Sequence, residues 1–189
     1  MTKILLACLI AAATVPAHAE LVTYAIDPTH TFVTFEANHM GTSTLRGRFD
    51  KKDGVVTLDK AGKTGKAEIT IDAASVSTGV PPLDTQLKSK DFFNATEFGT
   101  AKFSADKFAF NGDKVSEVVG TLTLLGKTQP VTLKASNFNC YTSPFLKREV
   151  CGGDFETTIA RSQYGMAYGL NVGLPDNIRL LIQIEAIKQ

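Results

Sequence analysis

Two side chains in this sequence have the chemistry to hold a polar or charged group inside apolar surroundings. Arg161 follows Phe155 and Ile159 in an alternating pattern, which places its guanidinium on their apolar face. A buried guanidinium needs a carboxylate, backbone carbonyls or the phosphate of a ligand, which it can bind through two hydrogen bonds. His39 ends another apolar face, where it could hydrogen-bond a polar group of a ligand or serve as an ordinary core histidine.

Other reactive arrangements are missing from the sequence. It contains no Gly-x-Ser-x-Gly motif, no phosphate-binding glycine loop and no Cys-x-x-Cys motif. His30 and His39 lie nine residues apart, with no cysteine or acidic residue at metal-ligand spacing. We therefore expect a protein that is not an enzyme, with no catalytic residues, metal site or cofactor.

The first 19 residues have the pattern of a secretory signal peptide. Lys3 is followed by the apolar run 4–13, and Ala17-His18-Ala19 forms a cleavage site of the small-x-small type. We expect residues 1–19 to be removed and residues 20–189 to form one domain in the bacterial periplasm. Cys140 and Cys151 then remain as an even pair, which in an exported chain predicts a disulfide, with two free thiols as the alternative.

The charge balance argues against nucleic acid as a partner. The chain has 20 basic and 19 acidic residues, and removal of Lys3 leaves 19 of each. A general nucleic-acid binder needs a basic face to displace counterions, and a net charge near zero does not predict one.

The elements that must position these side chains are short strands. Apolar and polar residues alternate in many runs separated by Gly, Asn, Asp and Pro, which is typical of an all-β sandwich or barrel. The pattern predicts about eight half-buried strands, allowing for a short one at Val55 to Leu58. Their apolar faces are carried by Val33, Phe35 and Ala37; Leu45, Gly47 and Phe49; Ala67, Ile69 and Ile71; Ala101, Phe103 and Ala105; Val118, Leu122 and Leu124; Val131, Leu133 and Ala135; Phe155 and Ile159; and Ile178, Leu180, Ile182, Ile184 and Ala186.

One segment departs from the strand pattern. After Val80-Pro81-Pro82, residues 83–93 allow a short helix with Leu83 and Leu87 on one side, ending at Phe92-Phe93. A single helix in a β chain most simply covers one end of a barrel.

Several blocks of the sequence, taken in order, resemble the YceI-like family of periplasmic polyisoprenoid-binding proteins. The similarity covers nearly all of the expected mature chain, and it weakens in the loop 140–151 and at 174–177. The matching blocks are residues 24–35 (YAIDPTHTFVTF), His39-Met40, Gly47-Arg48-Phe49, residues 87–93 (LKSKDFF), residues 120–128 (GTLTLLGKT) with Pro130-Val131, and residues 161–166 (RSQYGM).

The resemblance implies an eight-stranded antiparallel lipocalin-like barrel with an elongated apolar cavity. It implies an isoprenoid lipid, either a polyprenyl phosphate or a quinone, as bound ligand, and it admits a homodimer. A protein of this kind is also expected to make transient contact with a membrane or with membrane proteins.

A long apolar ligand needs an apolar tunnel with a few polar groups at its mouth. Each residue that we select for the tunnel could instead be ordinary core, and the entrance residues could instead fasten the helix to the barrel. The tunnel candidates are Val33, Phe35, Phe49, Ile69, Ile71, Phe103, Leu122, Leu133, Phe155, Ile159, Ile182 and Ile184; the entrance candidates are Phe92, Phe93, Met166 and Tyr168; and the polar candidates are His39 and Arg161.

Three functions remain compatible with these observations. The first is non-catalytic binding, storage or transport of an isoprenoid lipid. The second is an enzyme that acts on a lipid or quinone through His39 and Arg161. The third is a stress-response protein whose cavity is incidental.

Overall fold

The computed structural model describes residues 21–189, and the expected signal peptide at 1–19 lies outside this range. No helix in the described range is long and apolar enough to cross a membrane. The elements are β1 (Val22–Ile26), β2 (Phe32–His39), β3 (Ser43–Phe49), β4 (Lys52–Asp59), β5 (Thr64–Asp72), η1 (Ala73–Ser75), β6 (Val76–Ser77), α1 (Pro81–Lys88), β7 (Thr100–Asn111), β8 (Lys114–Leu124), β9 (Lys127–Thr142), β10 (Glu149–Ala160), η2 (Arg161–Tyr164), η3 (Leu170–Val172) and β11 (Asn177–Lys188).

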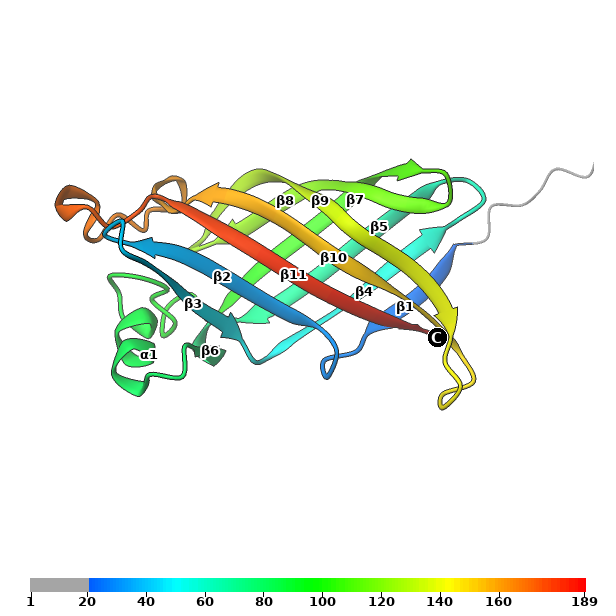
Figure 1. The fold of residues 1–189 in the computed structure, drawn as a ribbon, viewed down its shortest axis with the longest axis horizontal. Helices are drawn as coiled ribbons and strands as arrows, with labels where there is room; N and C mark the ends of the chain where they lie inside the picture. Colours follow the sequence, from blue (N-terminus) through cyan, green and yellow to red (C-terminus); the bar gives the residue numbers. More distant parts are fainter. Residues whose placement is uncertain (1–20) are drawn as a thin grey trace, which may run out of the picture.

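The sheet closes into a barrel of eight antiparallel strands, as the sequence predicts (Figure 1). The ring runs β1-β4-β5-β7-β8-β9-β10-β11, and β1 returns to pair with β11 through residues 24–26 and 186–188. The other half of β11 pairs with β2, and β3 and β6 follow β2 in the sheet. These three strands extend the wall at the end that carries α1.

The identity of the ring strands differs from the prediction. The alternating pattern places residues 31–39 and 45–49 among the eight strands, whereas β2 and β3 lie on the extension beside β11. The first ring strand, β1, is not among the predicted strands. Because β11 is long, its two halves can pair with two different strands, and periodicity alone does not reveal such sharing.

Three irregularities in the strand pairing reverse the alternation of side chains. The ladder skips Asp106 in β7, Ser116 in β8 and Ser136 in β9. A β-bulge adds one residue to one strand, so inward positions change parity beyond it. Phe108 and Phe138 therefore join the interior although they lie out of phase with the inward residues that precede the bulges.

The helix covers one end of the barrel, as expected, but it is shorter than the predicted segment. It spans Pro81–Lys88, with prolines in the first turn, where a missing N–H is tolerated. Leu87 is buried against the core cluster of that end, and Phe92 and Phe93 lie beyond the helix but pack on the same cluster.

A disulfide joins Cys140 of β9 to Cys151 of β10, which confirms the predicted pairing. The two residues are directly opposite in the ladder, and they close the base of the loop 143–148 at the end of the barrel opposite α1 (Figure 1).

Replacing both cysteines by alanine is expected to lower the free energy of unfolding by about 3 kcal/mol, because the unfolded chain regains the entropy of an open loop. Urea denaturation measures this loss. A reductant should weaken the native protein by a similar amount and leave the double variant unchanged. An unaltered urea midpoint in the double variant would show that the disulfide does not stabilise the fold.

Candidate functional site

An apolar cavity occupies the barrel between the core cluster near α1 and the disulfide. It contains about 1030 Å³ of space not filled by atoms, counting the part open to solvent. None of the described residues that line it carries a formal charge. Most of the predicted tunnel residues lie in its wall, namely Val33, Ile69, Ile71, Phe103, Leu122, Leu133, Phe155, Ile182 and Ile184.

The sequence reasoning missed most of the cavity wall near the disulfide. Val115, Phe108 and Phe138 lie beyond the bulges, so their parity appeared wrong for the interior. Tyr24 could have been found, because it alternates with Val22 and Ile26 in a short apolar run. The remaining wall residues not predicted for the tunnel are Thr31, Val56, Leu58, Ala67, Val118, Val131, Cys151, Gly152, Leu180 and Ala186.

Three predicted tunnel or entrance residues form an aromatic cluster that fills the barrel beneath α1. The ring centroids of Phe35, Phe49 and Phe93 lie 5.2–6.3 Å apart in tilted or edge-on arrangements. Gly47 lies opposite Phe35 in the ladder, and the ring leaves no room for a Cβ there. These aromatic rings close this end of the cavity instead of lining it.

The other apolar candidates near α1 also pack as core or surface. Ile159 and Met166 are buried in the same cluster as the three aromatic rings. Phe92 packs on Tyr168 with ring centroids 5.3 Å apart, and Tyr168 is half exposed. For these residues the structure favours docking of the helix and its loop to the barrel over an entrance.

Arg161 binds the protein's own backbone. Only 4% of its surface is exposed, and it begins the short helix η2 instead of continuing β10. Its three nitrogens donate hydrogen bonds to the carbonyls of Pro175 (2.7 Å), Met166 (2.9 Å) and Tyr168 (2.8 Å). Of the alternatives that the sequence left open, the structure selects backbone carbonyls, which engage all three nitrogens of the guanidinium.

His39 does not lie in the interior. It is the last residue of β2 and is exposed, because the strand runs past the end of the packed core before it turns at Met40. The expectation of an inward histidine is therefore wrong, since parity defines a face and does not show where the barrel ends.

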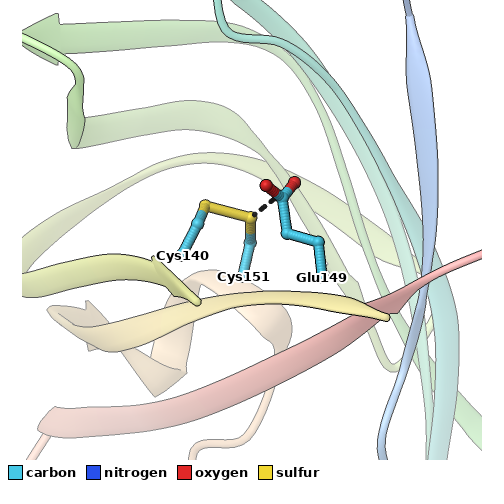
Figure 2. Close-up of side chains that lie close together, drawn as sticks. All are labelled: Cys140, Glu149 and Cys151. Carbon is cyan, nitrogen blue, oxygen red and sulfur yellow. Dashed lines mark hydrogen bonds between the residues drawn. A yellow bond between two sulfur atoms is a disulfide. The ribbon is translucent and has the colours of Figure 1, made fainter. Parts of the chain in front are cut away.

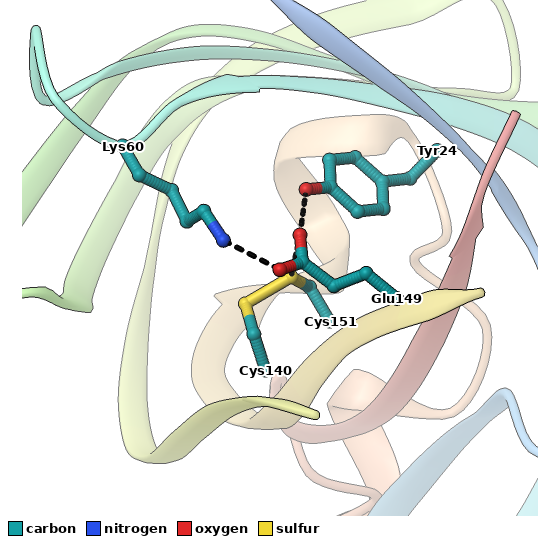
Figure 3. Close-up of a disulfide and its surroundings, with 5 residues drawn as sticks. All are labelled: Tyr24, Lys60, Cys140, Glu149 and Cys151. Atoms are coloured by element: carbon teal, nitrogen blue, oxygen red, sulfur yellow. Dashed lines mark hydrogen bonds and ion pairs between the residues drawn. A yellow bond between two sulfur atoms is a disulfide. The ribbon is translucent and has the colours of Figure 1, made fainter. Parts of the chain in front are cut away.

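A polar network closes the opposite end of the cavity (Figure 3). Glu149 accepts hydrogen bonds from the hydroxyl of Tyr24 and from Nζ of Lys60, the latter at 2.7 Å. These residues come from β10, β1 and the turn after β4, so the network ties three parts of the wall together. Tyr24 itself lines the cavity and is 1% exposed.

The network holds its members in defined protonation states. Burial alone would raise the pKa of the Glu149 carboxyl, but hydrogen bonds from Lys60 and Tyr24 outweigh it and lower that pKa. Burial and the bond to Glu149 raise the pKa of the Tyr24 hydroxyl, which therefore remains a donor at neutral pH.

The disulfide lies against this network (Figure 2). Among residues 21–189, Cys140, Glu149 and Cys151 place three potential metal-ligand atoms within 4.8 Å of one another. Cysteine binds metals as a thiolate, and both sulfurs are bonded to each other here. Sγ of Cys151 lies 3.7 Å from the carboxylate, and a disulfide sulfur has no proton to donate, so this is a packing contact.

Replacing Arg161 with methionine should lower the free energy of unfolding by about 3 kcal/mol, because three carbonyls lose their donor. Urea denaturation provides the measurement. Arg46→Met, which removes an exposed partner of Glu36, is the control and should cost less than about 1 kcal/mol. Normal stability combined with loss of bound phosphorylated lipid would instead make Arg161 a ligand-binding residue.

Replacing Glu149 with glutamine should destabilise the protein by about 1 kcal/mol at pH 7. The folded-state pKa of Glu149 is lowered, so its contribution is present above the unfolded-state pKa and disappears as pH falls through the folded-state value. The difference between variant and native protein should therefore shrink toward zero in acid. Glu117→Gln controls for loss of a carboxylate elsewhere. A difference that stays constant down to acid pH would contradict this assignment.

Comparison with known sequences identifies relatives of the whole barrel. A family model described as the YceI-like domain matches residues 24–186. A UPF0312 protein of Pseudomonas aeruginosa is 33% identical over 161 residues, which cover 85% of this chain and 83% of that protein. The protein YceI of Shigella flexneri is 32% identical with the same coverage.

Solved structures share the same architecture. A Campylobacter jejuni YceI protein aligns with a TM-score of 0.68 at 25% identity, covering 80% of this chain and 89% of that chain. BcnA of Burkholderia cenocepacia aligns with a TM-score of 0.69 at 24% identity, covering 85% and 99%. A polyisoprenoid binding domain from Saccharophagus degradans gives 0.65 at 16% identity, covering 89% and 99%. The last two likenesses show the fold alone, whereas the family model and the sequence relatives establish that this chain belongs to the YceI-like family.

Proposed function

We propose that this protein binds one long-chain isoprenoid lipid, a polyprenyl phosphate or a quinone, inside its barrel. It acts as a non-catalytic carrier or store in the periplasm, to which the pattern of residues 1–19 directs it. The observation that carries the proposal is the closed barrel with an uncharged apolar cavity along its interior.

The lining of the cavity suits a hydrocarbon chain. Sites for small molecules are mostly apolar, and the wall of this cavity is formed almost entirely by apolar side chains. Each square ångström of apolar ligand surface removed from water contributes about 25 cal/mol. A flexible isoprenoid tail gains affinity along its whole length without needing a polar partner.

The polar groups in the wall are engaged in holding the barrel together. Thr31 donates a hydrogen bond to the carbonyl of Glu185 at 3.2 Å, and Tyr24 donates to Glu149. Neither hydroxyl has a neighbouring histidine or cysteine thiol among its hydrogen-bond partners within residues 21–189. This arrangement supports binding over acid–base or nucleophilic catalysis.

The two ends of the cavity differ in polarity, which gives the lipid an orientation. Phe35, Phe49 and Phe93 close the end beneath α1 with apolar surface. At the other end, the Tyr24 hydroxyl gives its only hydrogen to Glu149, whereas the Lys60 ammonium is a cation that has N–H donors beyond the one bound to Glu149. We place the tail against the aromatic cluster and the polar head group toward Lys60.

One structural neighbour agrees with this ligand class. The domain from Saccharophagus degradans, which shares the fold, is described as a polyisoprenoid binding domain. The choice of an isoprenoid for this chain depends on its own apolar cavity.

Organic extraction of the purified protein followed by mass spectrometry should recover one isoprenoid lipid per chain. Ala67→Phe places a ring in the cavity wall and should lower that recovery about tenfold, because the added volume overlaps the ligand. The matched control is Ala109→Phe, at an exposed alanine on β7, which should retain the lipid. Equal recovery from both folded variants, or no lipid from the native protein, would refute the proposal.

A further inference from the structure

The loop between β9 and β10 presents large apolar side chains to solvent. Phe145 is 92% exposed and Leu146 is 45% exposed, while Tyr141 at the end of β9 is 46% exposed. The loop projects beyond the end of the barrel, away from α1 (Figure 1). An exposed phenylalanine ring is unfavourable in water. Burial of the loop tip, Phe145 and Leu146, in an apolar environment would therefore lower the free energy.

The tip is held in a defined shape. The backbone N–H of Ser143 donates to the carbonyl of Arg148, and the N–H of Lys147 returns to the carbonyl of Ser143, both at 2.9 Å. Ser143 is buried, and its hydroxyl accepts the N–H of Leu146 at 3.2 Å. With the disulfide closing the base, the loop presents Phe145 without a large loss of chain entropy on binding.

Positive charge follows the apolar tip directly. Lys147 and Arg148 come next in the sequence, and none of the ion pairs found within residues 21–189 includes either of them. Arg148 donates to the backbone carbonyl of Lys188, which brings a third cation to the same end. An aromatic and a leucine beside unpaired cations are the side chains that bind the interface of a bilayer with anionic lipids.

The opposite end of the described barrel exposes its apolar side chains less fully. Val172, Met40 and Val80 are 51–62% exposed there, against 92% for Phe145. Of the cations at that end, Arg46 and Arg179 form ion pairs with Glu36, whereas Lys88 and Lys90 form none among the described residues. The loop 143–148 is therefore distinguished by a nearly fully exposed phenylalanine directly before two cations.

We propose that the loop 143–148 inserts its tip into the surface of an anionic lipid bilayer. Docking in this orientation brings the end of the cavity that holds Lys60, Tyr24 and the disulfide next to the membrane. The role of docking, exchange of an isoprenoid with the bilayer, rests on the proposed function. Docking itself can be measured without any bound lipid.

The chain contains no tryptophan, so Phe145→Trp introduces a single fluorescent reporter at the tip. Vesicles of equal parts phosphatidylcholine and phosphatidylglycerol should shift its emission to the blue, and brominated lipid should quench it. Val172→Trp, at the other end, is the matched control and should respond to neither. Replacing both Lys147 and Arg148 with glutamine in the Phe145→Trp protein should weaken vesicle binding about tenfold or more.

Three results would overturn the docking proposal. They are no response from the Phe145→Trp reporter, an equal response from both reporters, and a shift that depends on protein concentration without vesicles, which would show that a second copy of the chain covers the tip. Lipid extraction from the same preparations separates the two proposals. Failure to dock with lipid still bound refutes only the docking, and docking by a protein that holds no lipid refutes only the carrier function.

Discussion

The pairing of β1 with β11 is the constraint on which the rest of this structure depends. It returns the sheet to its starting strand, so the inward side chains of eight strands share one enclosed space. Closure at eight strands leaves an interior that is either filled by side chains or able to hold one small ligand. Small inward residues such as Ala67 and Ala186 leave part of it empty, and the cavity follows from this combination.

Different kinds of side chain close the two ends of the barrel. Beneath α1, aromatic rings fill the interior. Arg161 donates hydrogen bonds to three carbonyls of the segment 165–176, which leads from η2 to β11. At the other end, Glu149 accepts hydrogen bonds from Tyr24 and Lys60 beside the disulfide. One end is thus filled by apolar rings, while the other is polar and linked to the loop that carries Phe145.

The strand faces, the covering helix and the disulfide were predictable from the sequence because each depends on local spacing or on cysteine parity. The wall near the disulfide was not, because bulges at Asp106, Ser116 and Ser136 reverse the alternation that defines a face. The sequence left the partner of Arg161 open among carbonyls, a carboxylate and a ligand phosphate, and the expectation of an inward His39 was wrong. Both follow from where a strand ends in space, which depends on the closed barrel and not on the periodicity of the strand itself.

A crystal structure of the protein purified without detergent or added lipid is the most direct test of the cavity as a lipid site. We expect continuous electron density for a hydrocarbon chain that runs from the aromatic cluster at Phe93 toward Lys60, with its polar group at the Lys60 end. Side chains rearranged to fill the interior, with no density between the walls, would contradict the account.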